Sequence, residues 1–190
     1  HRRYCPGDLA KLTLMRRLIS AGVAPAEAAE QALAHTGEVK IEKILKNFQV
    51  RQDIVDAIVS AANILDRNFV ESLIRKDIDK YGVIDSWQEV IVPVLVIVGD
   101  AWALTGTGIE VEHLLSETIT SVLRDHTKTM KTPINSRPVL LASVGEELHT
   151  LALHALHAAL SELKVECHFL GARTPLSALS TVVSRSAPPA

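Results

Sequence analysis

The chain has 190 residues, of which 47% are hydrophobic, and its formal net charge is −2. This length can hold one domain or two small ones, and the nearly neutral charge argues against a uniformly basic nucleic-acid binder. The longest apolar stretch, at 90–99, is shorter than a membrane span, no signal peptide opens the chain, and two distant cysteines predict no disulfide, so we expect a cytoplasmic protein.

The N-terminal segment is basic, because five positive charges between residues 2 and 17 stand against Asp8 alone, which gives +4. A turn at 6–8 leads into a predicted helix over 9–20, whose apolar side consists of Leu9, Leu12, Met15 and Ile19. Pro25 starts a second predicted helix over 26–34. The segment could contact phosphates, or its two helices could simply be solvated.

Helical periodicity from residue 51 to residue 127 predicts a four-helix bundle. The first two helices meet near Asp66, and the fourth spans 109–127. The predicted inward positions of these three helices are Ile54, Ala57, Ile58 and Ala61, then Phe69, Leu73, Ile74 and Ile78, and finally Val111, Leu115, Ile119 and Val122.

The third helix of this predicted bundle is unusually apolar. Ser86 and Glu89 have the spacing of a capping box at its start, and Pro93 should kink it. One apolar stripe contains Trp87, Val90, Ile91, Val94, Val98, Ala101 and Trp102. Because Val92 and Val96 point away from that stripe, we expect this helix to be covered on more than one side.

Three residues near the end of the bundle could belong either to its packing or to a site. Trp102 continues the apolar stripe, so the simplest reading is that it packs in the core. Glu112 lies at the core's edge, whereas His113 lies about 160° around the helix from Leu115. His113 must therefore face water or another layer.

The C-terminal third has the pattern of a parallel βαβ unit. An apolar strand at 138–144 is followed by a turn at 145–149, a helix over 150–163 and a second strand at 165–170. The helix should pack through Ala152, Leu156, Ala159 and Leu163, and we expect residues 184–190 to be disordered. Ligands bind beyond the carboxyl ends of such strands, where Glu147 and His149 lie. His149 could ligate a metal there, or merely be solvated or cap the helix.

The order of residues 1–4 (His-Arg-Arg-Tyr), the helix at 8–18 and the Ala-Gly-Val-Ala-Pro stretch that follows resembles the second half of a MerR-type DNA-binding domain. The resemblance implies that Arg2, Arg3 and Tyr4 close the wing and contact the DNA backbone. The recognition helix of such a domain would precede His1, so we expect weak or no sequence-specific binding by this chain alone.

Trp102, nine residues and then Glu112 and His113, followed by Glu147-x-His149, resembles the cobalamin-binding module of MerR-type photoreceptor repressors of carotenoid genes. The resemblance implies that His149 is the lower axial ligand of cobalt and that Glu147 hydrogen-bonds its imidazole. It also implies that Trp102, Glu112 and His113 cap the upper ligand, an adenosyl group in that family. Its members are tetramers that occupy their operator in the dark.

This resemblance implies a mainly α protein with a C-terminal α/β part. Its domains would be a winged-helix remnant at 1–47, the four-helix bundle at 48–131 and a partial Rossmann-like cobalamin domain at 132–190. We expect no enzyme activity. An enzyme of the Ser-His-Asp kind in particular would need a nucleophile elbow such as Gly-x-Ser-x-Gly, which the sequence lacks.

Departures from the family leave other interpretations open. Ala152 replaces a glycine near the corrin, Ala103 replaces a histidine that captures cobalt after illumination, and elements that line the nucleotide tail are missing. The chain could instead be a corrinoid carrier for methyl transfer, or a fragment of the regulator family without activity. A metal site of His149, His154 and His157 is a further alternative, although His149 and His154 do not share a helix face.

Overall fold

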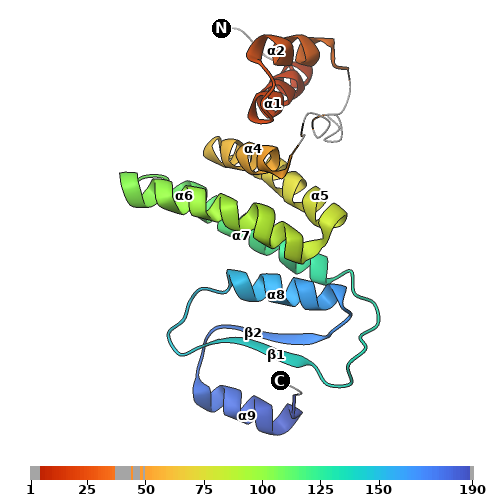
Figure 1. Cartoon of the computed structure of the whole chain (residues 1–190), viewed down its shortest axis with the longest axis vertical. Coiled ribbons are helices and arrows are strands. Elements are labelled where there is room, and N and C mark those ends of the chain that lie inside the picture. Colours follow the sequence, from red (N-terminus) through yellow and green to blue (C-terminus); the bar gives the residue numbers. More distant parts are fainter. Residues whose placement is uncertain (1–4, 37–43, 45–47, 49, 189–190) are drawn as a thin grey trace. The chain divides into compact units, whose positions relative to one another are not determined.

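The structure is a computed structural model that describes residues 5–36, 44, 48 and 50–188. Figure 1 shows its elements in chain order. The helices are α1 Pro6–Ser20, α2 Pro25–Ala34, α4 Arg51–Asn63, α5 Arg67–Ser86, a π-helix Trp87–Ile91, α6 Val92–Thr105, α7 Ile109–Thr127, α8 Leu151–Glu162 and α9 Leu176–Ser186, and the strands are β1 Val139–Val144 and β2 Cys167–Thr174. The predicted class, mainly helical with a C-terminal α/β part, is confirmed.

The chain divides into two compact units. The first comprises His1–Leu73 and Gln88–Leu115, and the second comprises Ile74–Trp87 and Ser116–Ala190. Both α5 and α7 contribute residues to each unit, so the units do not follow the order of the chain. The three domains expected from the sequence stay a prediction.

In the first unit, α1 packs against α2 and α4, and α4 packs against α6. The buried side chains of α1 are Leu14 and Leu18, whereas Leu9, Leu12 and Ile19 are exposed. The predicted apolar side of this helix was therefore wrong. Apolar residues lie on two sides of α1, and periodicity alone could not decide which side meets the neighbouring helices.

The predicted helices between residues 51 and 127 are present. Helix α4 ends at Asn63 and α5 begins at Arg67, as expected for a junction near Asp66. The predicted inward residues of α5 and α7 are buried, and so are Ala57, Ile58 and Ala61 of α4. The covering expected on the far side of α6 is not found in the described chain, because Val92 and Val96 are exposed.

The helical run around residue 86 differs from the prediction. Ser86 caps no helix; it is buried inside the run, and within the described residues its hydroxyl has no hydrogen-bond partner. The backbone instead breaks at Gly82, whose φ of 82° is accessible to glycine. The freed N–H of Val83 donates to the Glu162 carboxylate at 3.1 and 3.2 Å. A π-helix then ends at Ile91, two residues before Pro93, and both a π-helical turn and a proline are typical of kinked helices.

By length and composition alone, the helical run Arg67–Thr105 could cross a membrane. A buried helix of a soluble protein passes the same test, so this run is weak evidence for a membrane. The expected cytoplasmic location stays a prediction.

The second unit contains the predicted parallel βαβ unit. Strands β1 and β2 pair in parallel, and α8 packs against both. Figure 1 shows α8 and α9 on opposite faces of this two-stranded sheet. The buried residues of α8 are His154, Ala155, Ala158 and Ser161, while Leu156 and Leu163 are exposed, so the predicted face was wrong.

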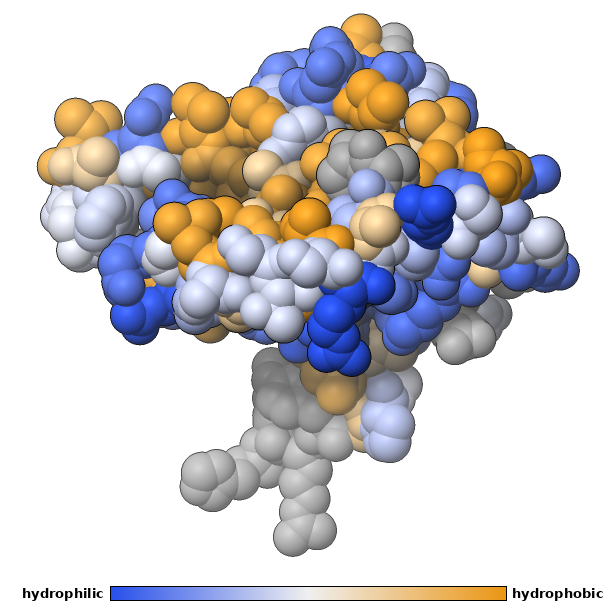
Figure 2. Space-filling model, turned by 90° about the horizontal axis from the view of Figure 1, so that it is seen from below, coloured by the Kyte–Doolittle hydropathy of each residue, from blue (hydrophilic) through white to orange (hydrophobic). Residues whose placement is uncertain are grey.

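Helix α9 was not expected from the sequence. Ser184, placed in the predicted disordered tail, lies within this helix, so that prediction fails for residues 184–186. Among the described residues, α9 buries none of its own side chains, and Leu176 and Val183 are exposed. Viewed from below, hydrophobic and hydrophilic patches are interspersed on the surface (Figure 2).

Candidate functional site

The loop between β1 and α8 is fixed by hydrogen bonds from the strands. Gly145 turns the chain out of the sheet with a φ of 69°, and its N–H donates to the Thr174 carbonyl at 3.2 Å. The Ser143 hydroxyl donates to the His149 carbonyl at 3.2 Å. The loop therefore starts and ends on atoms of the sheet.

Glu147 and His149 form a pair on this loop. One carboxylate oxygen, Oε1, accepts from the ring Nδ1 of His149 at 2.6 Å and from its backbone N–H at 2.7 Å. The backbone hydrogen bond, and next the ring hydrogen bond, hold the pKa of Glu147 below its ordinary value. The ring is almost entirely exposed, at 96%.

This geometry suits a metal ligand. When the neutral ring donates its proton from Nδ1 to the carboxylate, Nε2 is left with its lone pair. A carboxylate behind the imidazole is the usual way in which proteins orient a histidine toward a metal and increase its basicity. The donor set, one outward-facing imidazole with a carboxylate behind it, fits an axial ligand of cobalt.

The other two histidines of α8 do not join this site. The ring of His154 stacks on Phe169 at 4.2 Å, and that of His157 lies 5.9 Å from the same ring. Burial lowers the pKa of both histidines. No group of three or more metal-ligating side chains occurs in the described part of the chain. The alternative three-histidine metal site is therefore not formed there.

Trp102, Glu112 and His113 lie at the surface of the first unit. Trp102 is 48% exposed near the end of α6, so the expectation that it packs in the core was wrong. His113 also faces water, as one of its two predicted outcomes required, and its Nε2 lies 3.7 Å from Glu112 Oε2. Trp102 thus exposes part of a flat apolar ring, and the neighbouring Glu112 and His113 expose two polar groups.

The two alanines that depart from the family are both exposed. Ala103 follows Trp102 on α6, and Ala152 lies in the first turn of α8. A methyl group has no donor atom, so Ala103 cannot ligate a metal. At neither position is the side chain buried in the fold.

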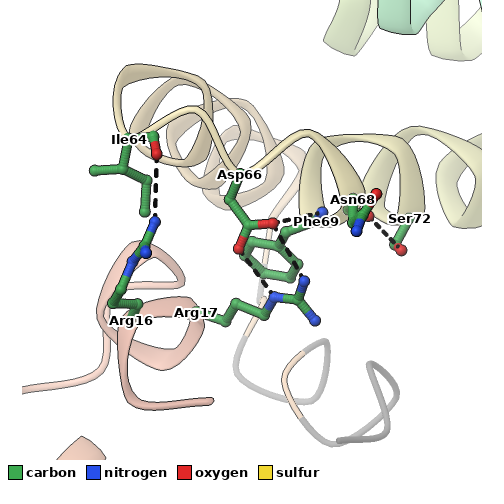
Figure 3. Close-up of polar contacts among 7 residues, drawn as sticks. All are labelled: Arg16, Arg17, Ile64, Asp66, Asn68, Phe69 and Ser72. Carbon is green, nitrogen blue, oxygen red and sulfur yellow. Dashed lines mark hydrogen bonds and ion pairs between the residues drawn. The ribbon is translucent and has the colours of Figure 1, made fainter. Parts of the chain in front are cut away.

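Part of the positive charge of the basic N-terminal segment is engaged in contacts within the protein. Arg2, Arg3 and Tyr4 lie outside the described residues, so their expected DNA contacts stay a prediction. Arg17 donates from Nε and Nη2 to the two carboxylate oxygens of Asp66, at 3.1 and 3.2 Å (Figure 3).

Two further contacts extend this cluster. The Arg17 guanidinium lies 5.3 Å from the centre of the Phe69 ring. Arg16 donates to the Ile64 carbonyl at 3.3 Å, also seen in Figure 3. Two of the five cations counted in the sequence therefore contact the bundle rather than stand free for phosphate.

Sequence reasoning missed one residue beside the loop. Arg173, at the end of β2, contacts both Glu146 and Glu147. No local pattern links residues 26 or 27 positions apart, so only the parallel pairing of β1 with β2 could have indicated this contact.

The comparisons with known proteins bear on the helical part. Residues 50–124 match the family model of a B12 binding domain, which covers less than half of the chain. Trp102, Glu112 and His113 lie within the match, whereas Glu147 and His149 lie beyond it. No curated protein matched the chain. Residues 50–124 are thus similar to a B12 binding domain, and cobalamin is a ligand that this similarity supports.

Proposed function

We propose that this protein binds cobalamin, with His149 as the lower axial ligand of its cobalt. The observation that carries the proposal is the His149 ring, which is held by Glu147 through Nδ1 and exposed at Nε2. The match of residues 50–124 supports the same ligand independently. When bound, cobalamin supplies a cobalt–carbon bond that light or an acceptor can break.

We also propose that Trp102, Glu112 and His113 cover the upper ligand of the cobalt, an adenosyl group in the photoreceptors that the chain resembles. The exposure of Trp102 supports this role, because a large aromatic ring that is half exposed is available for packing on a ligand. Glu112 and His113 would offer hydrogen bonds to its polar atoms.

We further propose that the protein is a transcriptional regulator rather than an enzyme. In this role Arg2, Arg3 and Tyr4 would contact operator DNA, and the protein would be an oligomer. The support is the resemblance of the N-terminal segment to MerR-type domains.

The cobalt ligand can be tested by titration with hydroxocobalamin, followed by absorbance after removal of free cofactor. We expect wild type to retain cobalamin with an imidazole-ligated spectrum and His149→Ala to lose it. His168→Ala, which removes an exposed histidine of β2, is the matched control and should bind like wild type. Equal retention by His149→Ala and wild type would contradict the proposal.

A corrinoid carrier for methyl transfer is the second candidate. The engagement of Arg17 with Asp66 favours it, because this contact leaves less positive charge on α1 for a phosphate backbone. The two functions differ in one measurement, the binding of operator-length duplex DNA at several salt concentrations. A regulator should bind duplex DNA through phosphate contacts with a steep salt dependence, even without strong sequence preference, whereas a carrier should not bind it.

A further inference from the structure

Arg173 has an unusual backbone conformation at the end of β2. Its φ is 52°, in the left-handed region that residues with a Cβ seldom adopt. Glycine would take this conformation at lower cost. A long charged residue there suggests that its side chain has a use.

The two strands are irregular just before this position. Their register shifts between Leu141 and Ala142, and again between Ala142 and Val144, so β2 contains extra residues relative to β1. Bulges of this kind re-aim side chains and are frequent beside functional sites. Here they bring the end of β2 against the loop that carries His149.

Arg173 holds that loop at two points. Its backbone N–H donates to the Glu147 carbonyl at 3.1 Å, and its guanidinium donates from Nη2 to the Glu146 carboxylate. With the bond from the Gly145 N–H to the Thr174 carbonyl, three successive loop residues are tied to two residues of β2. Glu147 is the residue that orients the His149 ring.

We propose that Arg173 is a positioning residue for the axial ligand, acting through Glu146 and Glu147 to keep the loop in the conformation that places a carboxylate behind the His149 imidazole. The cobalt-binding half of this inference rests on the proposed function. The loop-ordering half concerns the protein without cofactor and is tested separately.

The side chain and the backbone of Arg173 can be separated by substitution. Arg173→Gly keeps the backbone N–H and can adopt the φ of 52°, but it removes the guanidinium. Arg173→Lys keeps a positive charge. Lys164→Gly is a matched control, because Lys164 also has a positive φ, of 59°, but precedes β2 at the opposite end of the strand.

The experiment is amide exchange in the cofactor-free protein, observed by NMR at the His149 backbone N–H, which donates to Glu147. Since the guanidinium and Glu146 form an exposed pair, we expect Arg173→Gly to accelerate exchange about twofold to fivefold. Arg173→Lys should stay closer to wild type than Arg173→Gly does, and Lys164→Gly should match wild type. An exchange rate in Arg173→Gly equal to that in Lys164→Gly would overturn the proposal.

Binding of hydroxocobalamin gives a second readout. The affinity of Arg173→Gly should fall by a similar factor, about twofold to fivefold, with the imidazole-ligated spectrum unchanged in the bound fraction. Unchanged affinity together with accelerated exchange would refute the ligand-positioning half and leave Arg173 as a loop brace only. If wild type itself binds no cobalamin, the proposed function fails, and the exchange rates alone decide the role of Arg173.

Discussion

The loop at 145–149 and the surface of α6 and α7 present their candidate ligand groups in different ways. On the loop, Glu147, His149 and their neighbours are joined by hydrogen bonds of 2.6 to 3.2 Å, although their side chains are exposed. On α6 and α7, Trp102 and His113 are placed by regular helices, and Glu112 Oε2 approaches His113 Nε2 to 3.7 Å.

The difference concerns preorganisation. A metal ligand must be held in one orientation before binding, because disorder in the free protein lowers affinity. A covering surface needs only shape and apolar area, which an exposed helix face can supply. The loop should therefore respond to the loss of single hydrogen bonds, and the helix face to the loss of side-chain area.

The largest expected effect is on the free energy of unfolding, and it should differ between a buried residue of α7 and a half-exposed residue of α6. Leu115 is fully buried, and Leu115→Ala should lower the free energy of unfolding by about 2 to 5 kcal/mol. Trp102→Ala removes a half-exposed ring and should lower it by less, about 1 to 1.5 kcal/mol. Urea denaturation measures both. A cost for Trp102→Ala as large as that for Leu115→Ala would show that Trp102 is a packing residue after all.

On the loop, Glu147→Gln should weaken cobalamin binding about 10- to 100-fold, because the neutral amide orients the imidazole less well than a carboxylate. Equilibrium titration with hydroxocobalamin gives the affinity. Glu117→Gln, an exposed change on α7, is the control and should have no effect. Unchanged affinity in Glu147→Gln would mean that His149 does not depend on this hydrogen bond.

Asp66, like Glu147, is a carboxylate whose pKa is lowered by hydrogen bonds, but it is more buried than Glu147. Burial raises its pKa, but the hydrogen bonds and charge of Arg17 outweigh burial, so the pKa lies below the ordinary 3.8. A lowered pKa in the folded state stabilises the protein above pH 3.8, and this contribution disappears as the pH falls through the folded value. At neutral pH, Asp66→Asn should lower the free energy of unfolding by about 1 to 2 kcal/mol.

Denaturation of wild type and Asp66→Asn across acidic pH tests the sign of this pH dependence. The difference in the free energy of unfolding between wild type and Asp66→Asn should shrink as the pH falls below about 4. In this range the carboxylate of the unfolded wild type is protonated first, and the carboxylate of the folded protein follows at lower pH. A difference that stays constant down to about pH 2 would show that the ion pair with Arg17 is not its source.

The smallest expected effect is that one product of illumination does not form. Because Ala103 has no donor atom, illumination of the protein with bound adenosylcobalamin should leave no stable product in which two histidines ligate cobalt. The absorption spectrum after illumination and removal of free cofactor measures this. Ala103→His should restore such a product. A bis-imidazole spectrum in wild type that disappears in His113→Ala would show that His113 supplies the second ligand.

Periodicity predicted the fold better than it predicted the helix faces. The buried positions of α5 and α7 follow a single apolar stripe, and Phe69, Leu73 and Leu115 were correctly placed. In α1 and α8 apolar residues lie on several sides, so Leu14 and Ala158 became buried where Leu12 and Leu156 were expected. The face that meets a neighbour is decided by tertiary packing, which the local sequence does not contain.

The parts of the site that depend on distant pairing were not predictable. The Glu147–His149 pair is local, and its i, i+2 spacing was visible in the sequence. Arg173 reaches the loop only because β2 pairs with β1 through two register shifts, and Arg17 meets Asp66 across 49 positions. Helix α9 was missed because its serine-rich sequence has weak intrinsic helix propensity.

The central claim, that His149 ligates the cobalt of cobalamin, is tested most directly by electron paramagnetic resonance of bound cob(II)alamin in protein uniformly labelled with ¹⁵N. A ligand nitrogen from the protein splits each cobalt line into a doublet, whereas the unlabelled nitrogen of the cofactor's own base gives a triplet. We predict doublets in wild type and their loss in His149→Ala. Triplets in the labelled wild-type protein, with cobalamin demonstrably bound, would contradict the assignment of His149 as the axial ligand.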